Sequence, residues 1–353
     1  MKKRIYSADI LRISLLLIVF LCHTTFLITN ENLVILIGNA TGYALELFFI
    51  LSGFFVSANY INKNGLSFRR FIGHELKKFY PEHVLGYFAC LLLTLRSLHY
   101  YGNAIPWTSL LKQTLVNLLL LQSYTPMEAY VYSFNGVTWF LSSLFFCYVL
   151  TVPVLNFLKK RGGHSVTIIF LLFGTVLLRT LYVDIFNFWG IQGGFCYTNV
   201  FPPYRFLEYF CGMCLGGLYT QMDRQVNSLI QVAGLVGFVI LFLVHTYIQS
   251  MGPLFIVVEI FLLYSLFFFE GGVDKIGSGA VIKKLSDLTL TFFIFHQIVI
   301  KYVRWIFERF SLEFLECRAL IWLGLLALAI IVSYFMRNIC NEFRQRFLPS
   351  RRG

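Results

Sequence analysis

Long apolar runs recur from one end of the chain to the other, separated by short polar segments. A helix that crosses the hydrocarbon core of a bilayer needs about 20 predominantly apolar residues. The pattern therefore predicts an all-α fold, that of a polytopic integral membrane protein with about ten transmembrane helices. The ten expected spans are residues 10–29, 42–61, 83–100, 136–158, 165–183, 204–221, 227–248, 253–270, 285–303 and 317–336.

The positive charges between these spans predict an orientation. If the N-terminus lies inside, 20 of the 29 Lys and Arg residues fall on the inner side of the membrane. Lys and Arg concentrate in cytoplasmic loops, so we expect both termini in the cytoplasm. One further run, WTSLLKQTLVNLLLLQSY at residues 107–124, would invert this order if it crossed the membrane. We therefore expect it to form a re-entrant or interfacial helix on the outer side.

The composition agrees with a membrane protein. The chain is 58% hydrophobic and 13% charged, with a mean hydropathy of +0.72, whereas a soluble domain carries about 25% charged residues. The net charge of +12 follows from the inside bias of Lys and Arg, so we expect the lipid bilayer and no nucleic acid as a partner. The segments outside the spans are short, which predicts a single transmembrane domain over residues 1–353. The CxxC spacing at residues 211–214 lies in an expected span without a second pair, so no metal site is expected.

Ionisable residues inside the first span are the first candidates for chemistry. Asp9, Arg12 and His23 lie on one stripe of a helix, because 11 residues at about 100° each come to about 20° past three turns. His23 lies about 16 Å beyond Arg12 along the axis, deep in the membrane. Ionisable side chains at such depth face a protein interior or a wet cavity and mark functional sites. A structural reading, with an Asp9–Arg12 ion pair and a helix–helix hydrogen bond of His23, is equally open at this point.

Other spans carry further polar residues. Glu46 is a carboxylate in the second span, and His296 lies about eleven residues into the ninth. Arg205 and Glu208 are three residues apart on one helix face, which is also the spacing of a local ion pair. Two deep histidines with carboxylates nearby suit a proton-relay transporter, and they equally suit a general base with its orienting partners.

The segment FRRFIGHELKKFYPEH, residues 68–83, mixes basic and aromatic side chains on the inner side. Arg69, Arg70, Lys77 and Lys78 form either the basic face of an amphipathic helix on anionic lipid or a binding site for a phosphate-bearing ligand. No Gly-rich phosphate loop occurs in the sequence, which argues against an ATP-driven mechanism.

Six motifs, in this order over about 300 residues, resemble the acyltransferase-3 family of integral membrane acyltransferases. They are Asp9-Ile-Leu-Arg12 with His23 eleven residues after Arg12, ELFFILSGFFVS (46–57), KKFYP (77–81), VTWFLSSLFFCY (137–148), RFLEYFCGMCLG (205–216) and LSDLTLTFFIFHQIVI (285–300). Two positions depart from the family pattern. Leu144 stands where many members have a Glu, and lysines stand at 77–78 where arginines are usual. Lys lacks the bidentate fork of Arg, so the grip on a donor is expected to differ.

The resemblance implies a function. Members move an acyl group, by default acetyl, from cytoplasmic acyl-CoA (acetyl-CoA) to a hydroxyl of a lipopolysaccharide O-antigen or another surface glycan at the bacterial inner membrane. On this basis His23 is expected to be the general base, or a transient acyl carrier, with Glu46 as the carboxylate that orients its ring and His296 sharing the proton. The donor is expected at Arg12, Arg69, Arg70, Lys77 and Lys78, and the acceptor glycan at Arg205, Glu208 and Trp139.

Two other classes of protein remain alternatives. A proton-coupled glycan transporter or flippase would use the same histidines as a relay, although no internal repeat of the transporter kind is visible. A lipid-linked glycan polymerase or ligase would need a larger outer loop than this chain offers. A purely structural membrane subunit would leave the two deep histidines unexplained.

Overall fold

The computed structural model describes residues 4–100, 102, 104–160, 165–189, 194–248, 252–311 and 318–347. Nearly all regular structure in these residues is helical, which confirms the all-α fold. The longer helices are α1 (Tyr6–His23), α2 (Glu31–Tyr60), α3 (Phe68–Tyr100), α4 (Trp107–Leu118), α6 (Trp139–Lys160), α7 (Ser165–Trp189), α9 (Pro202–Gln221), α10 (Ser228–Ile248), α11 (Ile256–Phe267), α13 (Ala280–Arg309) and α14 (Arg318–Phe347). The short elements are η1 (Thr25–Leu27), η2 (Gln122–Tyr124), α5 (Glu128–Val131), η3 (Gly136–Thr138), α8 (Gly194–Asn199), β1 (Gln225–Val226), η4 (Gly252–Phe255), β2 (Phe269–Glu270) and α12 (Gly272–Gly277).

Every expected span overlaps a helix, but the helix bounds differ. Seven helices in the described part of the chain are long and apolar enough to cross a membrane; α3, α9 and α11 do not meet both criteria. Helix α3 begins at Phe68 and runs unbroken to Tyr100, with Pro81 inside it, so the expected inner segment 68–83 and the expected span 83–100 are one helix. Helix α4 has 12 residues, or about 18 Å, which is too short to cross the bilayer core and agrees with a helix that does not span.

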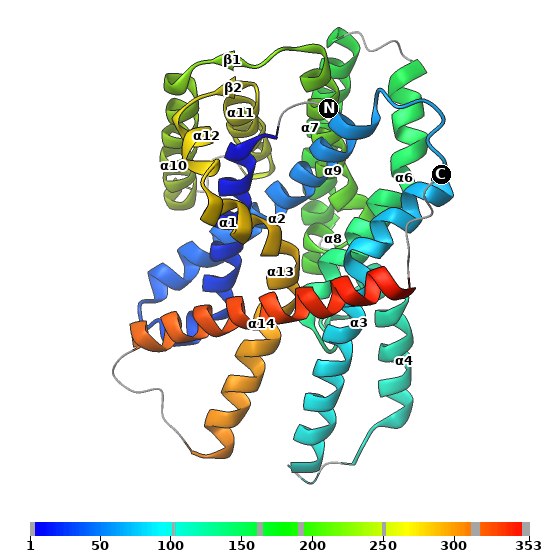
Figure 1. The fold of residues 1–353 in the computed structure, drawn as a ribbon, viewed down its shortest axis with the longest axis vertical. Coiled ribbons are helices and arrows are strands. Elements are labelled where there is room, and N and C mark those ends of the chain that lie inside the picture. The colour runs from blue at the N-terminus through cyan, green and yellow to red at the C-terminus, as the bar shows by residue number, and fades with distance from the viewer. Residues whose placement is uncertain are drawn as a thin grey trace.

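Helix α4 lies beside α3, and α14 runs across both α13 and α3 (Figure 1). The far end of α14 is fastened to α3, because Arg344 donates to the Glu82 carboxylate and, at 2.7 Å, to the Lys77 carbonyl. These contacts hold α3 in place around Lys77 and Glu82.

Glycines bring α2 and α9 into backbone contact. A Cβ atom added to Gly53 would lie 1.9 Å from the Tyr209 carbonyl oxygen, and one added to Gly212 would lie 1.9 Å from the Ile50 carbonyl oxygen. Small residues of this kind let membrane helices approach closely. The close approach strengthens the van der Waals packing that holds helices together in lipid, where the hydrophobic effect does not drive their association. Helix α2 is therefore fixed against α9 along the middle of its length.

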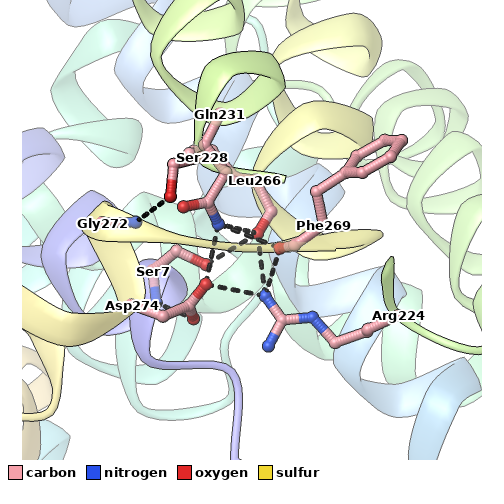
Figure 2. A network of polar contacts seen from close by, with 8 residues as sticks. All are labelled: Ser7, Arg224, Ser228, Gln231, Leu266, Phe269, Gly272 and Asp274. Carbon is pink, nitrogen blue, oxygen red and sulfur yellow. Dashed lines mark hydrogen bonds and ion pairs between the residues drawn. The ribbon is translucent and has the colours of Figure 1, made fainter. Parts of the chain in front are cut away.

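The start of α1 is held by residues far away in the sequence. Its N-cap residue Ile5 offers no side-chain hydrogen bond; instead the Asp274 carboxylate of α12 accepts from the backbone N–H of Ser7 at 3.0 Å. Asp274 also accepts from Arg224 at 2.9 Å and from Gln231 at 2.7 Å, as Figure 2 shows. This Asp274 network satisfies a free N–H of the first helical turn and so positions the helix that carries Arg12 and His23.

Candidate functional site

Asp9 and Arg12 lie together near the start of α1, as their spacing predicts. The buried Asp9 carboxylate accepts from the Ser286 hydroxyl of α13 at 2.7 Å and from Arg4 at 2.7 Å, and it lies 3.5 Å from the Arg12 guanidinium. Arg12 also stacks over the ring of Phe55 at 4.3 Å. Its positive charge is thus held in place by an anion on one side and a ring face on the other.

A cavity of about 790 Å³ opens beside Arg12, and we call it the Arg12 cavity. Cationic and polar groups line it from α2, α3 and the loop between them, among them Asn59, Lys63, His74 and Lys78. A smaller pocket of about 180 Å³ shares Arg12, Phe48, Ser52, Glu75, Lys78 and Tyr148 with it and is otherwise lined mostly by rings and aliphatic side chains, such as Phe140, Leu144 and Phe293. The combined space is polar and basic at its wide end and apolar at its narrow end.

The basic residues of α3 divide between this cavity and the surface. Lys78 lines the Arg12 cavity and donates to the buried Glu75 carboxylate at 2.8 Å. Lys77 instead borders two neighbouring pockets between α3 and α14. Arg69 and Arg70 are exposed on the first turn of α3 and do not line the cavity. Lys63 and His74 also line it, although neither was among the expected donor-binding residues.

His23 and His296 lie side by side, with ring centroids 5.2 Å apart. The fully buried His296 uses its Nδ1–H to donate to the Phe292 carbonyl oxygen at 3.0 Å, which leaves its Nε2 as a lone-pair acceptor without a hydrogen-bond partner among the described residues. Gln297 of the next position donates through its amide to His23 Nδ1 at 3.4 Å. The tautomers assigned by these bonds leave one basic nitrogen, His296 Nε2, available within the pair.

A wall of rings separates the pair from the narrow end of the Arg12 cavity. Phe293 lies 6.2 Å from His296, 5.2 Å from Phe140 and 6.4 Å from Phe48, all between ring centroids. The same three phenylalanines line the narrow pocket. A group that moved past them from the cavity would reach the two imidazoles.

The predicted pairing of Glu46 with His23 is wrong in this structure, where the partner of His23 is Gln297. Glu46 lies 2.5 Å from Arg179 of α7. Nine residues at about 100° each place Glu46 half a turn from Phe55, which faces Arg12. Glu46 therefore lies on a different face of α2 from the one that faces Arg12.

Arg205, Glu208 and Trp139 lie together but are enclosed. Arg205 donates twice to Glu208 at 2.8 Å, both side chains are buried, and the guanidinium lies 5.7 Å from the Trp139 ring centroid. Arg205 also donates to the Asn199 carbonyl oxygen at 2.5 Å. These bonds agree with the local ion pair that the sequence left open. The structure adds Arg179 and Glu259, which the sequence analysis overlooked although each is an isolated charge in a very apolar span.

A protein-family model described as an acyltransferase domain matches residues 5–337. No curated protein and no solved structure matches the chain.

Proposed function

Because the chain belongs to the acyltransferase-3 family and is a membrane acyltransferase, we propose that it transfers an acyl group, acetyl by family default, from acyl-CoA to a hydroxyl of a surface or lipid-linked glycan. The observation that carries this proposal is the Arg12 cavity with its narrow apolar extension, which ends at the rings beside His296. Acyl-CoA matches this cavity in shape and polarity, because its nucleotide end is charged and its acylated pantetheine arm is thin and uncharged.

The donor is proposed to bind with its phosphates at the wide end of the cavity. Arg12, Lys63 and Lys78 supply positive charge there, and Asn59 supplies an amide. Cationic side chains form the strongest hydrogen bonds to phosphate oxygens. Arg69, Arg70 and Lys77 lie outside this cavity and are proposed to attract the anion electrostatically rather than to grip it. The pantetheine arm would follow the narrow end between Phe48, Phe140 and Phe293.

The two imidazoles are proposed to act as the general base. The acceptor hydroxyl oxygen attacks the thioester carbonyl carbon, so that a C–O bond forms and the C–S bond breaks. The hydroxyl proton passes to His296 Nε2, and the leaving coenzyme A thiolate takes a proton from the imidazole pair, which restores the starting state. Gln297 holds the His23 ring beside His296 through its hydrogen bond to His23 Nδ1. The two imidazoles then share the proton as one unit.

We further propose that the basic, donor-binding face lies toward the bacterial cytoplasm and that the glycan arrives from the other side, as the distribution of Lys and Arg favours. Arg205, Glu208 and Trp139 are enclosed in the helix bundle. In this proposal they support the packing of α6 and α9 near the site instead of binding the sugar.

The experiment uses purified protein in lipid vesicles with labelled acetyl-CoA and a glycan acceptor, combined with mass spectrometry of surface glycans from cells with and without the gene. We expect one acetyl increment per repeat unit, and loss of that increment in His23→Ala at unchanged protein level. Normal acetylation by His23→Ala would remove His23 from the mechanism. Glycan movement driven by a proton gradient, without any ester, would replace the proposal by the transporter alternative.

A further inference from the structure

Five charged side chains meet between α2, α7, α9 and α11, away from the two histidines. We call them the buried charge cluster: Glu46, Arg179, Arg205, Glu208 and Glu259. Arg205 and Glu208 are at most 2% exposed, Glu259 is fully buried, and Glu46 is the most accessible of the five at 14% of its side chain. No step of the proposed acyl transfer uses this cluster.

The two arginines are already committed within it. Arg205 binds Glu208 through two hydrogen bonds of 2.8 Å. Arg179 lies 2.5 Å from one oxygen of Glu46 and 3.3 Å from Glu208. Two of the three carboxylates therefore have a guanidinium partner.

The third carboxylate has none. Neither oxygen of Glu259 has a hydrogen-bond donor among the described residues, and the second oxygen of Glu46 lacks one too. The two carboxyl groups are nevertheless close enough to interact with each other. Two ionised carboxylates in this position would repel each other in a medium of low dielectric constant, and only Glu46 would be compensated by a guanidinium partner, Arg179.

Among the residues that the structure describes, the other polar groups beside the cluster bring no positive charge that would balance it. Tyr43 of α2 and Tyr204 and Cys211 of α9 are neutral groups beside it. From α10, His245 lies beside Tyr43, whose hydroxyl is 2.5 Å from His245 Nε2. Two guanidinium groups against three carboxylates leave one excess negative charge.

We propose that Glu46 and Glu259 share one proton, so that the buried charge cluster is a proton-binding site with no net charge. One proton placed between the two carboxyl groups supplies the missing donor and removes the excess charge at the same time. Paired carboxyl groups in enzymes share a proton for the same reason. This inference is independent of the proposed acyl transfer, because it follows from the contacts of the cluster alone.

The proton is proposed to exchange through Tyr43 and His245. Tyr43 lies three residues before Glu46, on the same face of α2, and its hydroxyl lies 2.5 Å from His245 Nε2 near the end of α10. Neither Tyr43 nor His245 lines the Arg12 cavity, so protonation of the cluster is proposed to be separate from donor binding.

Infrared spectroscopy of the wild-type protein in vesicles tests the proposal directly. A neutral carboxylic acid has a C=O stretching band that a carboxylate lacks. We expect such a band at neutral pH and its loss in Glu259→Gln, with the folded state retained because the neutral amide replaces a neutral acid. Absence of any Glu259-dependent band would overturn the proposal.

Glu208→Gln is the matched control, since it removes a carboxylate that is paired with two arginines. We expect Glu208→Gln to lower the thermal unfolding temperature and Glu259→Gln to leave it within error of the wild type. Equal destabilisation by both variants would mean that Glu259 is ionised. Should Glu259→Gln fail to fold, the wild-type band is followed on raising the pH, where we expect it to disappear; a wild-type spectrum without the band at neutral pH contradicts the shared proton.

Discussion

Replacement of His296 by glutamine removes the one basic nitrogen that the imidazole pair leaves available. Glutamine is neutral and of similar length, and it fills much of the space among Phe20, Phe292 and Phe293, whose rings surround His296. The variant therefore removes a proton acceptor with little change in packing. We expect acyl transfer to fall sharply while the protein remains folded.

The size of the loss follows from the role of the nitrogen. A positioned general base contributes a factor of about 10²–10⁴ to the rate, or about 3–5 kcal/mol of barrier at about 1.4 kcal/mol for each tenfold change. His23 lies too close, with ring centroids 5.2 Å apart, for the two rings to act independently. Groups that act as a unit lose most of their effect with the first substitution. The double variant His23→Gln/His296→Gln should therefore be little slower than either single variant.

The assay is steady-state transfer by the purified protein in vesicles at several donor concentrations. We expect kcat to fall and the KM for the donor to change little, because the donor phosphates are proposed to bind at the other end of the Arg12 cavity. His99→Gln is the matched control, since His99 is exposed at the end of α3; it should transfer at the wild-type rate. The thermal unfolding temperature of each variant checks that the fold is retained.

Two results would refute this reasoning. A His296→Gln rate within about threefold of the wild type would place the base elsewhere, because the smallest expected effect of a base is larger. Single-variant losses that multiply in the double variant would show that the two imidazoles act in separate steps.

Three further predictions concern donor binding, helix packing and acid stability. Lys78→Ala should raise the donor KM several-fold with little change in kcat, because one phosphate contact of the wide end is removed. Gly212→Ala should lower the unfolding temperature, since the new Cβ would meet the Ile50 carbonyl oxygen at 1.9 Å and overpacking costs about 1–3 kcal/mol or more. Burial alone would raise the pKa of Asp274, but hydrogen bonds from the Ser7 N–H, Gln231 and Arg224 outweigh it and lower the pKa. The stability that Asp274 contributes is therefore present above its unfolded pKa of about 4 and is lost as the pH falls through the folded value. The unfolding temperature of the wild type should thus fall more steeply on acidification than that of Asp274→Asn.

Each of these has a control in the same chain. Lys284→Ala removes an exposed lysine at the start of α13 and should leave the donor KM unchanged; an equal rise in both lysine variants would indicate a general charge effect. Gly237→Ala adds a Cβ to a helical glycine with no atom within 4 Å and should be tolerated, so equal losses in both glycine variants would contradict backbone contact. Parallel acid profiles of the wild type and Asp274→Asn would show that the Asp274 network is not held by the carboxylate charge.

The helices and the neighbours within one helix were predictable from the sequence, because both depend on local rules. Apolar length predicts spans, and the helical period predicts which residues share a face. The neighbours Asp9 and Arg12 were found in this way. Helix bounds were less accurate. The expected inner segment 68–83 is the first part of α3, which continues past Pro81 to Tyr100.

Side-chain partners were not predictable, because they depend on how helices far apart in the sequence pack. The partner of Glu46 is Arg179, 133 positions later, and the start of α1 is capped by Asp274. The sequence also could not separate Lys78, which lines the Arg12 cavity, from Arg69, which does not. Glu259 did carry a usable signal, since a lone carboxylate in an apolar span requires a partner or a proton.

Helix α2 joins the Arg12 cavity to the buried charge cluster, which affects how mutations in the cluster are to be interpreted. Phe48 and Phe55 face the cavity, whereas Glu46 faces Arg179. A substitution of Glu46 that breaks its bond to Arg179 would shift α2 and the cavity wall together, so its loss of activity would not show contact with His23. A direct role in proton transfer would lower kcat alone, whereas displacement of α2 would raise the donor KM as well. The kinetic split, rather than the loss itself, therefore distinguishes a group that touches the reacting atoms from one that positions the helix.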